Sequence, residues 1–216
     1  MVQVSAMLAA VSCLLTYASA SPVVGERDAD PAAAYTIVDG PIEWKGALIE
    51  GGEEVHLTGA SIQEIVAKAQ ALNPAFSLLA ESEVAATAPH LVARQTPLTP
   101  FTDGSQTAIH CGWPPGWTPT WDFTALHEGI EYMRRMPGDC RAPAGPGHCE
   151  RVSCSWGSAI YYCNDNRSEH WEPCRWIGDV AAAIVTKCAD RDGNGRTLGQ
   201  AFDQRNWNVI VASGSC

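Results

Sequence analysis

Cysteine carries the most definite chemistry in this chain of 216 residues. There are nine cysteines, and Cys13 stands apart from the other eight, which all fall between positions 111 and 216. Those eight are Cys111, Cys140, Cys149, Cys154, Cys163, Cys174, Cys188 and Cys216. An even set of cysteines in an exported chain predicts a framework of disulfides, whose pairing the pattern leaves open. Because no C-x-x-C pair occurs, a structural zinc site is disfavoured.

A second pattern offers ligands for calcium. Asp190, Asp192 and Asn194 alternate before Gly195, as oxygen ligands do at the start of a calcium-binding loop. The twelfth position, which should supply a bidentate carboxylate, is Ala201. The segment is therefore more typical of a polar turn, and calcium is the one cofactor that the sequence raises.

Three indole rings are spaced four residues apart in a proline-rich segment. Trp113, Trp117 and Trp121 could stack on sugars or anchor the protein on a receptor, since aromatic rings bring much contact area at low entropic cost. The alternative is that they cover the sheet near Cys111, because tryptophan is usually mostly buried. The sequence favours this second interpretation.

Histidine and glutamate could together perform acid–base hydrolysis. His127 and Glu131 form H-E-x-x-E rather than the zinc pair H-E-x-x-H, and a solvated helix face explains them. The other candidates, which the sequence does not bring together, are His110, His148, His170, Glu128 and Glu169. Asn166 begins an N-glycosylation sequon in a polar loop, which a mass shift would reveal.

The N-terminus has the pattern of a secretory signal peptide. Residues 7–16 are mostly apolar, and Ala18, Ser19 and Ala20 are the small residues that signal peptidase requires. We therefore expect residues 1–20 to be removed after Ala20, together with Cys13, and the protein to be secreted and extracellular. The remaining sequence has no apolar stretch long enough for a transmembrane helix, so no membrane span is expected.

Acidic residues are concentrated in the region that follows. The formal net charge is −10, which argues against a nucleic-acid partner, because that affinity comes largely from Lys and Arg. Residues 21–94 contain four basic and eleven acidic residues and no cysteine. Arg94 then precedes a Thr/Pro-rich linker, residues 95–107, where an endoprotease could cut. We interpret residues 21–94 as an acidic pro-segment that inhibits, assists folding or persists.

The pro-segment has a pattern of its own. Its expected strands are Tyr35–Val38, Ile42–Ile49 and Val55–Leu57. Ser61 and Glu64 form a capping box, and the helix that follows should end at Asn73 and Pro74. A small sheet plus a helix predicts that this segment can fold alone.

Residues 108–216 form the expected cysteine-rich domain. The spacing predicts one helix from about Asp122 to Pro137, and a second whose apolar residues run from Ile177 to Cys188. Between them, residues 151–163 read as a hairpin around Gly157–Ser158, and Trp207–Val211 is a last strand. The fold class is α+β: a small antiparallel sheet with two helices packed on it, a disulfide-stapled two-layer α/β sandwich preceded by the small ββα pro-segment.

The order of these elements resembles a known group of proteins. The series Cys149–Cys154–Cys163, a helix closing in Cys188 and the run Asn206–Val211 before Cys216 look like fungal secreted cysteine-rich proteins related to virally encoded killer toxins and necrosis-inducing effector domains. This resemblance covers residues 108–216 and implies a compact sandwich without catalysis. It also implies action by binding at a cell surface. Such toxins are basic or depend on a lysine, whereas Lys187 is the one lysine here, so channel block is not carried over.

The expected function is therefore that of a secreted, non-enzymatic, toxin- or effector-like protein. It would bind a protein or glycan on the surface of another cell after release from a pro-form. Two alternatives remain open at this point. One is a small secreted hydrolase with ribonuclease-like His/Glu chemistry, and the other is a carbohydrate-binding module built on the three tryptophans.

Overall fold

The computed structural model describes residues 35–80, 106–189 and 195–216. The helices are α1 (Ile62–Leu72), α3 (Phe123–Arg135) and α4 (Cys174–Cys188). The strands are β1 (Thr36–Ile37), β2 (Ile42–Ala47), β3 (Glu54–Gly59), β4 (Gln106–Cys111), β5 (Asp139–Ala142), β6 (His148–Ser155), β7 (Ser158–Asn164), β8 (His170–Pro173), β9 (Gly199–Asp203) and β10 (Trp207–Ser213).

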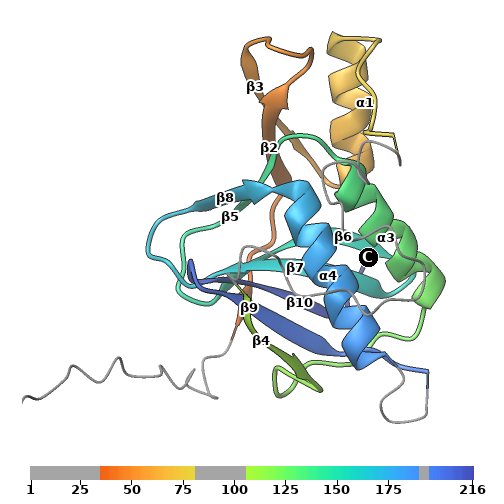
Figure 1. Ribbon diagram of the computed structural model, residues 1–216, viewed down its shortest axis with the longest axis vertical. Helices are drawn as coiled ribbons and strands as arrows, with labels where there is room; N and C mark the ends of the chain where they lie inside the picture. The colour runs from red at the N-terminus through yellow and green to blue at the C-terminus, as the bar shows by residue number, and fades with distance from the viewer. Residues whose placement is uncertain (1–34, 81–105, 190–194) are drawn as a thin grey trace, which may run out of the picture.

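These strands form two sheets. The larger has six strands in the order β1-β6-β7-β10-β9-β4, and the smaller has four in the order β3-β2-β5-β8. All described pairs are antiparallel except β1 with β6. Helices α3 and α4 lie side by side over the large sheet (Figure 1). The expected α+β fold with two helices packed on a sheet is confirmed. In the smaller sheet, β5 and β8 are strands that the sequence did not predict.

The main core lies between the two helices and the large sheet. The apolar spacing of α4 places Ile177 and Ile184 toward the sheet, where both are fully buried. Along β10 the side chains alternate, so Val209 and Val211 join this helix-side core. Helices α3 and α4 are further joined by the Arg134–Asp179 ion pair, with Nε and Oδ1 2.8 Å apart.

The opposite face of the large sheet has its own smaller core. Ile210 and Tyr161 belong to it, and Trp117 and Tyr35 pack against it. Trp117 meets the Tyr161 ring edge-on with centroids 4.9 Å apart. This face is therefore covered by single aromatic side chains from distant segments, where the helix-side face is covered by helices.

The β6–β7 hairpin turns one residue earlier than expected. The sequence predicts a turn at Gly157–Ser158, but Ser158 is already paired with Ser155, and the turn residues are Trp156 and Gly157. Both have positive φ angles, 49° and 76°. A two-residue turn with positive φ at both positions matches the right-handed twist of the strands, which is why this register is adopted.

Residues 35–80 contain the strands β1, β2 and β3 and the helix α1. That they form a separate ββα pro-segment stays a prediction. Ser61 caps α1 by accepting a hydrogen bond from the Glu64 amide at 3.2 Å. These elements do not stand apart from the cysteine-rich region, however, because β2 pairs with β5. Within β5 the pairing with β2 covers Asp139 and Cys140, while Arg141 and Ala142 pair with Trp171 and His170 of β8.

Candidate binding surface

All eight expected disulfide cysteines are paired, which confirms the predicted framework. The bridges are Cys111–Cys188, Cys140–Cys174, Cys149–Cys163 and Cys154–Cys216. Cys111–Cys188 joins the end of β4 to the end of α4, and Cys149–Cys163 joins neighbouring strands of the hairpin. Cys154–Cys216 fixes the C-terminal residue to the same hairpin near its turn.

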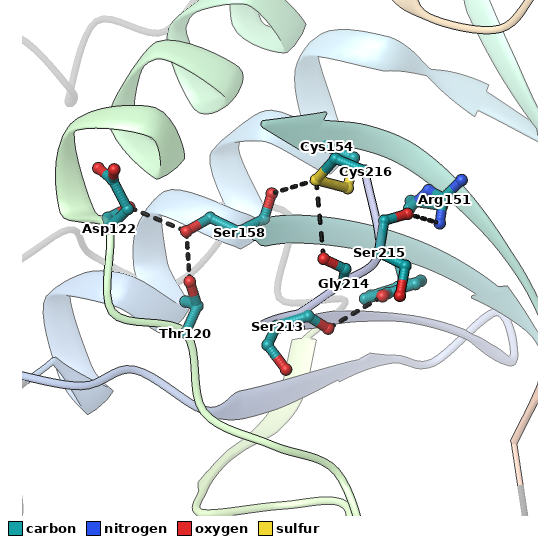
Figure 2. Close-up of a disulfide and its surroundings, with 10 residues drawn as sticks. Thr120, Asp122, Arg151, Cys154, Ser158, Ser213, Gly214, Ser215 and Cys216 are labelled. Carbon is teal, nitrogen blue, oxygen red and sulfur yellow. Dashed lines mark hydrogen bonds between the residues drawn. A yellow bond between two sulfur atoms is a disulfide. The ribbon is translucent and has the colours of Figure 1, made fainter. Parts of the chain in front are cut away.

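The C-terminal tail is held against this hairpin by hydrogen bonds as well (Figure 2). The Tyr161 hydroxyl donates to the Ser213 carbonyl at 3.0 Å. Arg151 Nη1 donates to the Ser215 carbonyl at 2.6 Å. The Gly214 amide donates to the Gly157 carbonyl at 3.0 Å. The tail is thus fixed at three points besides the disulfide.

The segment that leads into α3 is fixed to the same place through Ser158. Figure 2 shows the Ser158 hydroxyl between Thr120 and Asp122: it bonds the Thr120 hydroxyl and donates to the Asp122 carbonyl at 3.0 Å. Asp122 in turn caps α3 by accepting from the Ala125 amide at 2.9 Å. Because Ser158 is buried, this junction is shielded from water and orders the residues around it.

Two exposed tryptophans flank this junction. Trp121 lies between Thr120 and Asp122, and Trp156 lies two residues before Ser158, so both belong to one end of the molecule. Their exposed fractions are 63% and 83%. The Arg196 guanidinium lies 5.0 Å from the centre of the Trp121 ring, within range of a cation–π contact. We call the set Trp121, Trp156 and Arg196 the tryptophan surface.

The backbone of Trp156 has an unfavourable conformation, with a φ angle of 49°. A bulky residue with positive φ is a true outlier, since its side chain crowds the backbone in the left-handed region. The ring gains almost no burial in return. A strained conformation that presents an apolar ring to solvent is of the kind that clusters at binding sites.

The three sequence-predicted tryptophans therefore differ from one another. Trp113 is half-buried, and Trp117 is half-buried against Tyr161, whereas Trp121 is exposed. Trp156 was not among the candidates. The signal for it was present in the Trp-Gly dipeptide between the two strands of the predicted hairpin, where a turn with positive φ places the first side chain in solvent.

Of the histidines proposed from sequence, His170 lies beside a glutamate, and this glutamate, Glu172, is not one of those proposed. His170 Nε2 lies 3.1 Å from Glu172 Oε1, and Arg205 Nη1 lies 3.0 Å from the same oxygen. Tyr162 is fully buried nearby, and burial together with the Glu172 charge raises the pKa of its hydroxyl. Alternation along β8 places His170 and Glu172 on one face, which the sequence would allow one to predict.

The other acid–base candidates are scattered. His127, Glu128 and Glu131 are exposed on α3. His110 packs edge-on against Phe202, and His148 Nδ1 contacts the Ala144 carbonyl. Glu169 accepts from the Trp171 indole at 3.1 Å.

Asn166 is engaged within the protein. Its Nδ2 donates to the Asn164 side chain at 3.0 Å and to the carbonyls of Arg205 and Asn206 at 3.0 and 3.2 Å. Glycan attachment takes place at this nitrogen, so it would require these hydrogen bonds to be given up. N-glycosylation of Asn166 stays a prediction that the geometry does not favour.

The remaining predicted sites fall outside the described residues. These are the processing residues Ala20 and Arg94 and the calcium candidates Asp190, Asp192 and Asn194. Ala201 lies buried in β9. Among residues 35–80, 106–189 and 195–216, the structure has no group of three or more His, Cys, Asp or Glu side chains that could hold a metal ion.

Within the same described ranges, none of the helices has the length and apolar character needed to cross a membrane. No protein-family model, curated protein or solved structure matches the chain.

Proposed function

We propose that the protein is a secreted, non-enzymatic, toxin- or effector-like protein that binds a target on the surface of another cell and is processed from a pro-form after Arg94. Four disulfides suit an oxidising, extracellular setting. The observation that carries the proposal is the tryptophan surface. Trp121 and Trp156 present large apolar rings to solvent, as residues of interaction sites do.

The chemistry of this surface fits recognition better than turnover. Tryptophan rings supply large, rigid contact area and are enriched at binding hot spots. The Cys154–Cys216 bridge and the Ser158 junction order the backbone beneath them, so little conformational entropy is lost on binding. Preorganised aromatic anchors of this kind bind either a protein pocket or the face of a sugar ring.

The test is binding of the labelled, secreted protein to intact cells of other species. The double variant Trp121→Ala/Trp156→Ala should lose binding by about tenfold or more, since each anchor contributes at least about 1 kcal/mol. The matched control is Leu72→Ala, because Leu72 on α1 is exposed to the same 63% as Trp121. Equal binding by both variants and the parent would contradict the proposal.

Treating the target cells beforehand separates the two kinds of target. Loss of binding after protease treatment points to a protein, and loss after glycosidase treatment points to a glycan. The carbohydrate-binding alternative, built on Trp113, Trp117 and Trp121, predicts the second result. It also predicts that Trp117→Ala with Trp121→Ala abolishes binding to a glycan array. Retained binding by that pair would leave Trp156 as the main anchor.

A second function is favoured by the contact of His170 with Glu172 and Arg205. A histidine, a carboxylate and a guanidinium within hydrogen-bonding distance are the groups that ribonuclease-like hydrolysis needs. Hydrolysis of RNA with a pH-dependent rate that His170→Ala abolishes would establish it. His127→Ala is the matched control, since His127 is exposed on α3. Absence of turnover, or equal turnover in both variants, would leave the cluster with a structural role.

A further inference from the structure

We propose that residues 35–80 are a permanent subunit of the working protein: cleavage after Arg94 yields two polypeptides that stay bound to each other without a covalent link. The proposal is independent of what the tryptophan surface binds. It concerns the interface between the pro-segment elements and the cysteine-rich region, and it selects persistence over release. Figure 1 shows β2, β3 and α1 projecting from the end of the molecule where β5 and β8 lie.

The small sheet is made from both polypeptides. In the order β3-β2-β5-β8, two strands come from residues 35–80 and two from the cysteine-rich region. The central pair crosses the junction, with Trp44 opposite Cys140 and Lys45 opposite Asp139. Removing residues 35–80 would leave β5 and β8 as a two-stranded ribbon with an open edge. Such a ribbon is marginal in water and prone to pair with other chains.

Trp44 is the main apolar anchor of this interface. Its side chain is completely buried, and its Nε1 donates to the Pro137 carbonyl at 2.6 Å. On one side the ring meets Phe76 of its own segment edge-on, with centroids 5.9 Å apart. On the other it lies against Gly138, where an added Cβ would come within 2.8 Å of Nε1, so the cysteine-rich region leaves room for the indole only by having glycine there.

The anchor is part of a continuous core. Ile42, Ile65 and Val66 from the N-terminal segment belong to the same buried cluster as Met133 and Met136 of the cysteine-rich region. A unit of this size without disulfides is at best marginally stable alone, because it buries only a small share of its apolar surface. Each side therefore completes the core of the other.

Both ends of the segment are tied down as well. At the start, the Thr36 and Val38 amides donate to the carbonyls of Gly147 and Cys149, each at 2.8 Å. At the end, the Leu79 amide donates to the Arg135 carbonyl at 2.9 Å, and Arg135 Nε donates back to the Leu79 carbonyl at 2.8 Å. Separation would break all of these bonds at once.

Charges cross the interface with the correct signs. Glu43 accepts a contact of 2.7 Å from Arg141, and Lys45 lies 4.0 Å from Asp139. Lys45 also lies 4.8 Å from the Trp171 ring centre. An acidic and a basic residue of β2 thus each face a residue of opposite charge in β5. These two pairs favour the observed register of β2 on β5.

The association must be non-covalent. All eight cysteines between 111 and 216 pair with one another, and residues 21–94 contain none. Two polypeptides produced by a cut after Arg94 can therefore be separated by a denaturant without reduction. This makes the proposal directly testable.

The experiment uses the full secreted chain with residues 90–95 replaced by the recognition sequence of a site-specific protease. After complete cutting, non-reducing denaturing electrophoresis should show two polypeptides. Size-exclusion chromatography and native mass spectrometry at micromolar concentration should show one species that contains both. Elution of two separate species under native conditions would overturn the proposal.

Substitutions then locate the interface. In the cut protein, Trp44→Ala should weaken association by at least about a hundredfold, since truncating a buried tryptophan is among the costliest core changes. The matched control is Ile49→Ala, whose side chain in the same segment is 62% exposed and should leave association unchanged. If the two variants dissociate equally, the interface described here is not what holds the polypeptides together.

Discussion

Glu150 is a buried carboxyl group in the hairpin, facing charges from both parts of the chain. Burial raises the pKa of Glu150 from its ordinary value of 4.5 to about 7; Arg141 opposes this shift and Glu43 adds to it. Between pH 4.5 and about 7, Glu150 is therefore protonated in the folded protein and ionised in the unfolded chain. Its contribution to stability is full below about pH 4.5 and is lost as the pH rises to about 7.

This sign predicts the behaviour of Glu150→Gln. The neutral amide removes the penalty of ionising a buried group, so the variant should be more stable than the parent above pH 7, by up to about 3 kcal/mol, and similar to it near pH 4.5. Thermal unfolding at both pH values checks this. Glu128→Gln, on the exposed face of α3, is the control. An equal pH dependence in parent and Glu150→Gln would contradict the assignment.

Trp156 separates the demands of stability from those of binding. Its φ of 49° is unfavourable for tryptophan, whereas asparagine adopts this region readily, and Asn-Gly is the preferred sequence for a turn of this kind. We expect Trp156→Asn to raise stability by about 0.5–1 kcal/mol while weakening cell binding. Denaturant unfolding and the cell-binding assay measure the two effects. A variant that binds normally, or that is less stable, would show that the ring has a structural role.

Among the elements, the β6–β7 hairpin carries two of the four disulfides. Cys149–Cys163 closes a short loop of sequence separation 14 between strands that already pair, while Cys154–Cys216 spans a separation of 62 and orders the tail. In the loop-entropy account the longer bridge contributes about 4 kcal/mol and the shorter about 3 kcal/mol. The longer one alone also fixes the backbone under the tryptophan surface.

Removing each bridge separately tests this division. The pair Cys154→Ser/Cys216→Ser should weaken cell binding and destabilise the protein by about 4 kcal/mol. The pair Cys149→Ser/Cys163→Ser should cost less stability and leave cell binding intact, because the β6–β7 ladder keeps the hairpin in place. Unfolding in denaturant and cell binding report the two results. Equal loss of binding in both would mean that the tail has no special role.

Elements defined by local patterns were predictable, and elements defined by distant partners were not. The apolar spacing of α4 and the Ser61 cap of α1 lie within single segments, and both were expected. Strand β5 has only four residues, and its partner β2 is more than ninety residues earlier in the chain. For the same reason the sequence suggested Trp121 but gave no sign that Trp156 lies at the same end, because that proximity depends on Ser158.

At the scale of the whole molecule, the boundary seen in composition is not a boundary in the fold. Cysteine content and charge both change near residue 94, which favoured two units that fold separately. The core and the small sheet nonetheless run across it. Disulfides stabilise the cysteine-rich region, and acidic residues keep the N-terminal segment soluble. The fold is set by the burial of apolar side chains such as Trp44, which packs against residues of both parts.

A chain that joins the signal peptide directly to residue 95 puts this to the test during biosynthesis. Without β2 and β3, β5 has an open edge and the core lacks Trp44. Formation of the four native disulfides should then be slower than mispairing of cysteines and aggregation. We expect at least about a tenfold loss of secreted protein. Supplying residues 21–94 as a separate secreted polypeptide should restore it. Secretion of the shortened chain at the parent level, with no free thiol, would mean that the cysteine-rich region folds without its N-terminal partner.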